Sequence, residues 1–175
     1  MAAQVFWLNG TFGVGKSSAA RMLAATHADS YVFEPELIGH VLKRLPASPP
    51  RHHNYQHLRL WRLLTRWTLL LLSHAWRGVL IAPMTMVEPR PRTETIFALR
   101  RAGLMVHEVV LVASQDRVAA RMRARGAPPD NWGLRQFTRC ATHLEHILSQ
   151  FHIASIDTDD LDLAATVDAL AQLFP

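Results

Sequence analysis

The residues with the clearest chemical role lie in a glycine-rich loop near the start of the chain. The segment GTFGVGKS, residues 10–17, has the pattern G-x-x-x-x-G-K-S. In loops of this kind, successive backbone N–H groups point at phosphate oxygens, and the following helix adds its positive N-terminal end. Lys16 can bridge the β- and γ-phosphates of a nucleotide, and the Ser17 hydroxyl can coordinate Mg²⁺. The loop predicts binding of ATP or GTP and phosphoryl-transfer chemistry.

The sequence on either side of the loop supports this prediction. Residues 5–8 form a short apolar stretch typical of a strand, and residues 15–27 are alanine-rich, which favours a helix. By chance alone the pattern would occur in about one in two hundred chains of this length, so coincidence is a poor explanation. The predicted phosphate site comprises Gly10, Thr11, Phe12, Gly13, Val14, Gly15, Lys16, Ser17 and Ser18, with Ser17 as the metal ligand.

The rest of the chain narrows the class of P-loop protein. It lacks the N-K-x-D signature of guanine-specific switch proteins. The third expected strand runs on as VLIAPMTM, residues 79–86, without an aspartate where many P-loop enzymes have one. A mechanochemical ATPase is therefore disfavoured, and a small kinase remains. Mg²⁺ would then depend on Ser17, the phosphates, water and Glu34.

Two glutamates follow the second expected strand, residues 31–33. In parallel α/β sheets, ligands bind beyond the C-terminal ends of the strands, so we expect Glu34 in the crevice beside the loop. A carboxylate there can accept the proton of an acceptor hydroxyl or orient it for in-line attack. Both Glu34 and Glu36 would also favour the start of the helix expected after Pro35. Catalysis is the preferred role for Glu34, and helix capping for Glu36.

Arginines are concentrated in the segment DRVAARMRARG, residues 116–126. Arg117, Arg121 and Arg125 are spaced at i, i+4 and i+8, so they share one face of a helix. An anion that neutralises this row of like charges would explain it. Together with Arg135 and Arg139, these residues predict a hinged basic lid over residues 117–139 that closes on the phosphates. The alternative is a solvated basic face that pairs with acids elsewhere.

The elements that must position these residues follow an α/β order, with short apolar stretches alternating with helical segments. No internal repeat or long linker divides the chain, so we expect one domain over residues 1–175, with a loop at 47–53. The expected strands span residues 5–8, 31–33, 79–82, 106–112 and 153–156. The expected helices span residues 15–27, 35–45, 55–76, 92–102, 115–125, 132–150 and 161–173.

The helix expected over residues 55–76 is amphipathic. One stripe is apolar and another is basic: Leu60, Leu63, Leu64, Trp67 and Leu71 form the first, and Arg59, Arg62 and Arg66 the second. We expect Trp61 and Trp67 to pack in the core, unless an apolar acceptor pocket uses one of them. The basic stripe is by default a solvated face, but it can also hold an acidic acceptor or rest against anionic lipid. We expect the acceptor region at about residues 47–76.

Composition restricts the partners. Hydrophobic residues make up 49% of the 175 residues and charged residues 19%, as in soluble globular proteins. We expect neither a transmembrane segment nor a signal peptide, and the single cysteine, Cys140, fits a cytoplasmic location. The net charge of +5 favours polyphosphate over nucleic acid, because no aromatic platform or DNA-binding signature accompanies it. The ten histidines form no defined metal site.

Four passages carry a family resemblance: WLNGTFGVGKSS, VFEPELIG, LIAPMTMVEP, and RMRARG followed by Asn131-Trp132. In these passages the chain resembles the ATP-binding tunicamycin resistance proteins, small relatives of nucleotide, shikimate and chloramphenicol kinases. The resemblance implies a three-layer P-loop NTPase fold, in which a five-stranded parallel sheet has the P-loop on its central strand. It also implies ATP with Mg²⁺. Arg121 and Arg125 match the adenine and lid arginines of related kinases, and Glu34 matches an aspartate base of the chloramphenicol kinases.

Three functional hypotheses follow in order of preference. The first is an ATP-dependent kinase for a small hydroxylated molecule such as an antibiotic, with Lys16, Glu34, Arg121 and Arg125 as catalytic residues. The second is an ATP-binding protein that sequesters an antibiotic such as tunicamycin without modifying it. The third, nucleic-acid binding, ranks last. The sequence leaves the acceptor and the oligomeric state open.

Overall fold

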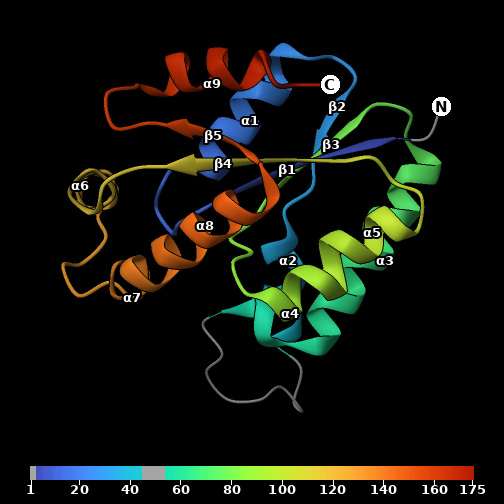
Figure 1. Ribbon diagram of the computed structural model, residues 1–175, viewed down its shortest axis with the longest axis horizontal. Coiled ribbons are helices and arrows are strands. Elements are labelled where there is room, and N and C mark those ends of the chain that lie inside the picture. Colours follow the sequence, from blue (N-terminus) through green and yellow to red (C-terminus); the bar gives the residue numbers. More distant parts are fainter. Residues whose placement is uncertain (1–2, 45–53) are drawn as a thin grey trace.

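Five parallel strands form one sheet in the part of the chain that the structure, a computed structural model, describes. The described residues are 3–44 and 54–175, so the loop expected at 47–53 lies outside them. The sheet order is β2-β3-β1-β4-β5, which places β1 and the loop after it at the centre, as expected (Figure 1). The strands are β1 (Gln4–Gly10), β2 (Ser30–Val32), β3 (Val79–Pro83), β4 (Val106–Val112) and β5 (Ala154–Asp157).

Helices cover both faces of this sheet and complete the three expected layers (Figure 1). On one face lie α1 (Lys16–Thr26) and α9 (Leu163–Ala171). The opposite face carries α3 (Arg59–Ala75), α4 (Pro89–Arg92), the π-helical turn η2 (Thr93–Phe97), α5 (Ala98–Arg101) and α8 (Phe137–Phe151). The remaining elements are α2 (Pro35–Leu42), the 3₁₀ turn η1 (Tyr55–His57), α6 (Gln115–Ala124) and α7 (Trp132–Arg135).

The central strand is buried on both faces because its side chains from Val5 to Leu8 are all apolar and point alternately to the two faces. Val5 and Trp7 pack with residues of α3 and α5, whereas Phe6 and Leu8 pack with residues of α1 and α9. All four side chains are fully buried. This burial fixes the C-terminal end of β1, where the glycine-rich loop begins.

Two of the expected helices differ in detail. The helix expected over residues 132–150 is divided at Gln136 into α7 and α8, and the Asn131 side chain caps α7 by accepting from the Gly133 N–H at 2.8 Å. The helix expected at 92–102 begins earlier, at Pro89, and includes η2. Proline suits a first helical turn, which explains the earlier start.

The expectation for the two tryptophans of α3 is confirmed for Trp61, which is fully buried, and wrong for Trp67, which is 53% exposed. The whole apolar stripe that contains Trp67 is exposed: Leu60, Leu63, Leu64, Trp67 and Leu71. The buried face carries Trp61, Thr65 and Leu69, together with Arg62, which was expected to be solvated. Trp61 Nε1 donates to the Pro35 carbonyl at 2.8 Å, and Arg62 pairs with Glu94 at 2.8 Å. These polar anchors select the buried face, which periodicity alone did not identify.

No helix within the described ranges is both long and apolar enough to cross a bilayer.

Candidate nucleotide and acceptor site

The glycine-rich loop has a backbone that only glycines adopt easily. Gly10, Gly13 and Gly15 have φ values of 146°, 81° and 115°, in the region that disfavours other residues. Space is also restricted, because a Cβ on Gly10 would lie 2.6 Å from the Leu111 carbonyl oxygen. One on Gly13 would lie 2.6 Å from the Met122 sulfur. The loop therefore has the curled shape that turns N–H groups toward a bound anion.

Lys16 is held at the base of this loop. Its Nζ donates to the carbonyls of Gly10 and Thr11 at 3.1 and 2.8 Å, and to Thr85 Oγ1 at 2.9 Å. Burial lowers the pKa of the Lys16 ammonium from 10.5 to about 8, while the Glu36 carboxylate partly raises it. A phosphate beside Nζ would favour the charged form in the same way as Glu36, so the site is suited to a polyphosphate.

Thr85 fastens the end of β3 to the loop, a role that the sequence did not suggest. Its hydroxyl donates to the Gly10 carbonyl at 2.8 Å as well as accepting from Lys16. Thr85 comes two residues after β3, at the place where many P-loop enzymes have an aspartate. That position was the feature of the sequence that could have identified Thr85. Within the described residues, no group of three or more His, Cys, Asp or Glu side chains is arranged to hold a metal ion.

A buried polar network lies beneath the loop. Asn9 Oδ1 accepts from the Gly10 and Met86 N–H groups at 2.9 and 3.0 Å, and its Nδ2 donates to Glu108 at 3.1 Å. Glu108 also forms a two-pronged ion pair with Arg92, in which neither side chain is more than 2% exposed. Sequence reasoning missed this network, although an acid within the apolar stretch of β4 was a visible signal.

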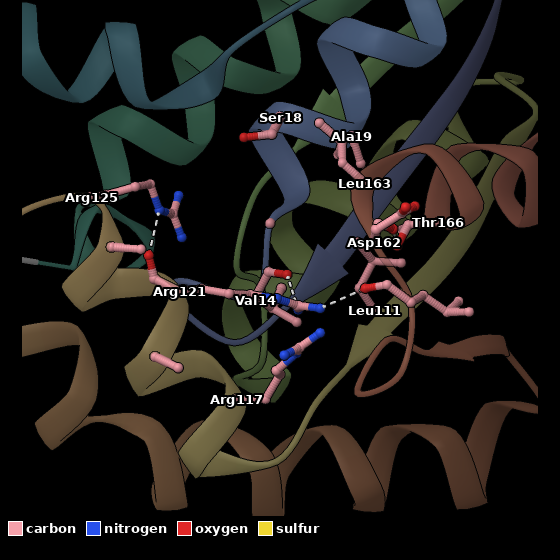
Figure 2. Close-up of a pocket in the computed structure, with 14 residues that line it drawn as sticks. Val14, Ser18, Ala19, Leu111, Arg117, Arg121, Arg125, Asp162, Leu163 and Thr166 are labelled. Atoms are coloured by element: carbon pink, nitrogen blue, oxygen red, sulfur yellow. Dashed lines mark hydrogen bonds between the residues drawn. The ribbon is translucent and has the colours of Figure 1, made fainter.

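A hollow of about 450 Å³ lies on the α1 side of the loop. Its wall brings together α1, α6 and the start of α9 (Figure 2). Of the predicted nucleotide-binding residues, Val14, Gly15, Ser18 and Arg121 line it. This hollow adjoins the phosphate loop at Val14 and Gly15. It is therefore suited to the base and ribose of a nucleotide whose phosphates lie in the loop.

Three arginines line this hollow: Arg117 and Arg121 of α6, and Arg125 directly after it (Figure 2). Their spacing predicted that they share one face. Arg121 Nη1 donates to the Val14 carbonyl at 3.0 Å and to Thr158 Oγ1 at 2.9 Å. Its burial lowers the pKa of this guanidinium. Arg125 Nη2 donates to the Gly13 carbonyl at 2.9 Å. These arginines therefore hold α6 against the P-loop backbone.

The other two arginines of the expected lid lie elsewhere. Arg135 Nη1 donates to the Asp130 carbonyl at 2.6 Å, within its own turn. Arg139, on α8, pairs with Glu88. Neither lines the nucleotide hollow. The structure thus brings together three of the five arginines that the sequence grouped.

The acceptor side of the loop has its own hollow, of about 260 Å³. Phe12 lies in its wall and contacts Trp132 edge to face, with ring centroids 4.8 Å apart. Glu36 also lines it. Glu34 does not; its carboxylate pairs with Arg21 at 2.6 Å. The preference for Glu34 over Glu36 at the acceptor thus stays a prediction, and the geometry favours the reverse order.

Comparison with known proteins agrees with this arrangement. A family model described as an AAA domain matches residues 5–147. The fold is similar to that of the tunicamycin resistance protein of Deinococcus radiodurans, with a TM-score of 0.78 and 29% identity over 97% of this chain and 94% of that one. No curated protein sequence matches the chain.

Kinases have the same fold at lower identity. A gluconokinase from Sinorhizobium meliloti is 19% identical, with a TM-score of 0.67, over 97% of this chain and 91% of that one. The APS kinase of Mycobacterium tuberculosis is 16% identical, with a TM-score of 0.65, over 98% and 97%. The matched family model, the loop geometry and the sheet order lead to one conclusion: the chain belongs to the AAA domain family and has its P-loop kinase-like fold.

Proposed function

We propose that the protein is an ATP-dependent phosphotransferase whose acceptor is a small hydroxylated molecule. The observation that carries this proposal is the presence of two hollows on either side of one phosphate loop. The first is lined by Val14 and Gly15, and the second by Phe12. A donor bound in the first and an acceptor bound in the second would meet across the loop that Lys16 braces, which is the arrangement that in-line transfer requires.

The loop residues fit a triphosphate with its Mg²⁺. The buried Thr11 hydroxyl has no hydrogen-bond partner among the described residues, so it is available to a phosphate oxygen. The loop N–H groups would bind the phosphates, and Lys16 would neutralise the charge that develops during transfer. Ser17 would hold Mg²⁺ together with phosphate oxygens and water. The metal would supply further charge neutralisation at the transferred group.

On the acceptor side, we assign the proton-accepting role to Glu36. It lines the acceptor hollow, and its negative charge acts to raise the pKa of the Lys16 ammonium. Its carboxylate can therefore orient an acceptor hydroxyl near the transferred phosphate and take up its proton. Glu34 would need to leave Arg21 to act in the same way, and it serves as the comparison residue.

The test measures ADP formation with Mg-ATP across a panel of hydroxylated compounds, followed by mass spectrometry for an added phosphate. We expect Lys16→Ala to lower kcat/KM by about 100-fold or more, since it removes a charge that stabilises the transition state. Glu36→Gln should lower kcat more strongly than Glu34→Gln. Equal activity of all three variants and the parent chain would exclude the proposed roles.

The similarity to a tunicamycin resistance protein favours one alternative, in which the chain sequesters an antibiotic without modifying it. Tunicamycin is accordingly the first compound to test. Nucleotide-dependent binding with recovery of unmodified ligand would support sequestration and contradict phosphoryl transfer. An added phosphate on the ligand would support the kinase.

A further inference from the structure

The outward face of α3 is an apolar stripe, which we call the α3 stripe: Leu60, Leu63, Leu64, Trp67 and Leu71. These side chains are 51%, 41%, 37%, 53% and 68% exposed. Their spacing of i, i+3, i+4, i+7 and i+11 places them in one row along three turns of the helix. Five large apolar side chains gathered in one exposed row are unusual for a surface that faces only water.

Two arginines without a carboxylate partner in the described part of the chain lie beside the stripe, in a part of the sequence rich in positive charge. Residues 37–87 contain no aspartate or glutamate and seven lysines and arginines. Arg59 and Arg66 lie two turns apart on the same side of α3, and neither has a hydrogen bond or ion pair within the described residues. With Leu60 and Leu63 they line a hollow of about 570 Å³. Its single acid, Glu94, is already paired with Arg62 and Arg90.

We propose that α3 docks on an anionic lipid bilayer, lying in the plane of the membrane surface. The α3 stripe would enter the boundary between headgroups and acyl chains, and Trp67 suits that boundary because its ring is apolar with a polar edge. Arg59 and Arg66 would contact lipid phosphates from the edge of the stripe. This surface lies outside both hollows described above, so the inference does not depend on phosphoryl transfer.

A second copy of the chain fits this face less well. A symmetric contact between two α3 helices would place Arg59 and Arg66 of each copy beside a surface of the other whose one lining acid, Glu94, is already paired. The like charges of the two copies would repel without a further carboxylate to compensate them. An anionic bilayer supplies the missing negative charge and the apolar phase together.

Docking through α3 would also orient the acceptor side. The inner face of α3 is joined to the start of α2 by Trp61, which donates to the Pro35 carbonyl at 2.8 Å. Arg62 reaches the Gln56 carbonyl of η1 at 2.6 Å. Residues of α2 and η1 line the acceptor hollow, so that hollow would lie near the bilayer surface.

The experiment is co-sedimentation of the full chain with vesicles of phosphatidylglycerol and phosphatidylcholine, compared with pure phosphatidylcholine vesicles. We expect binding to the anionic vesicles that weakens with salt. Arg59→Gln/Arg66→Gln should weaken it about tenfold or more, and Leu63→Ser/Trp67→Ser should weaken it by at least about tenfold. The matched charge control is Arg123→Gln/Arg135→Gln, on α6 and α7. The matched apolar control is Met22→Ser/Leu173→Ser, at side chains 37% and 39% exposed.

Circular dichroism and thermal unfolding establish that each variant is folded, which is expected because the substituted side chains are exposed or, at Arg66, half-buried. Quenching of tryptophan fluorescence by brominated lipid should fall in Trp67→Phe. Equal binding to both kinds of vesicle, or no loss in the α3 variants, would overturn the proposal. So would a dimer, seen by light scattering, that Leu63→Ser/Trp67→Ser dissociates in the absence of any vesicle binding.

Discussion

At the scale of single residues, Lys16 combines burial with a charge that it must keep in order to bind phosphate. Its ammonium is surrounded by two loop carbonyls and a hydroxyl, and burial brings its pKa to about 8. A lysine with a lowered pKa binds fewer protons in the folded chain than in the unfolded chain between about pH 8 and 10.5. Because of this group, the free energy of unfolding therefore increases as pH rises through that window.

The same pKa predicts how nucleotide affinity depends on pH. Bound phosphates favour the charged lysine, so binding above pH 8 requires proton uptake. We expect the affinity for a non-hydrolysable ATP analogue to be constant below about pH 8 and to fall by up to about tenfold per pH unit above it. Titration calorimetry from pH 7 to 9.5 measures this. Lys16→Arg is the control, since a guanidinium stays charged throughout; a flat profile for the parent chain would contradict the prediction.

Thr85 gives a second prediction at this scale. Its hydroxyl joins the end of β3 to the Gly10 carbonyl and to Lys16. Thr85→Ala should cost about 1 kcal/mol in the free energy of unfolding and should lower kcat by about tenfold, because Lys16 loses a positioning partner. Thr85→Ser keeps the hydroxyl and should keep the activity. Denaturant unfolding and steady-state kinetics test the two variants. A Thr85→Ala chain with full activity would show that Thr85 does not position Lys16 for catalysis.

The two glutamates show what spacing can and cannot predict. The sequence placed both after β2, at the sheet edge where the loop lies, and this placement is correct. Which of them faces the acceptor depends on where the side chains of α2 point, and on Arg21, a partner 13 positions away that takes up Glu34. Long-range pairing of this kind leaves no local signature in one sequence.

At the scale of elements, α3 shows the same limit. Its apolar residues predicted the helix correctly, and Trp61 is in the core as expected, but Trp67 is exposed. The buried face carries two polar contacts, Trp61 with Pro35 and Arg62 with Glu94, beside the apolar packing of Leu69. Periodicity shows that a helix has two different faces. It does not show which face is buried, because that depends on elements distant in the chain.

The ion pair between Arg92 and Glu108 joins the α4 region to β4 beneath the loop and gives an element-scale prediction. Both side chains are almost fully buried. Arg92→Ala should lower the free energy of unfolding by about 3–5 kcal/mol, because it leaves an unpaired buried charge. Arg92→Met/Glu108→Leu removes both charges and should recover much of that loss. Chemical denaturation measures each free energy. A double variant no more stable than Arg92→Ala would contradict the view that the unpaired charge of Glu108 causes the loss.

At the scale of the whole molecule, the five-stranded parallel sheet with the P-loop on its central strand could be expected from the sequence, because the loop motif and the family resemblance imply one fold. The strands differ from expectation by at most about two residues at their ends, as is usual for element boundaries. The two hollows could not be predicted, since each is built from segments far apart in the chain.

This arrangement predicts how ligands change the stability of the whole chain. A nucleotide analogue at about 100 times its Kd should raise the free energy of unfolding by about 2.7 kcal/mol, which for a chain of this size raises Tm by about 5–10 °C. Lys16→Ala should lose this shift while its own Tm stays close to that of the parent chain, because removing a buried charge offsets the lost hydrogen bonds. An acceptor bound in the second hollow should add a further shift in the presence of the analogue. Differential scanning fluorimetry measures the shift in Tm for the nucleotide analogue alone and for the analogue with acceptor. A full nucleotide shift in Lys16→Ala would indicate that the nucleotide binds outside the loop.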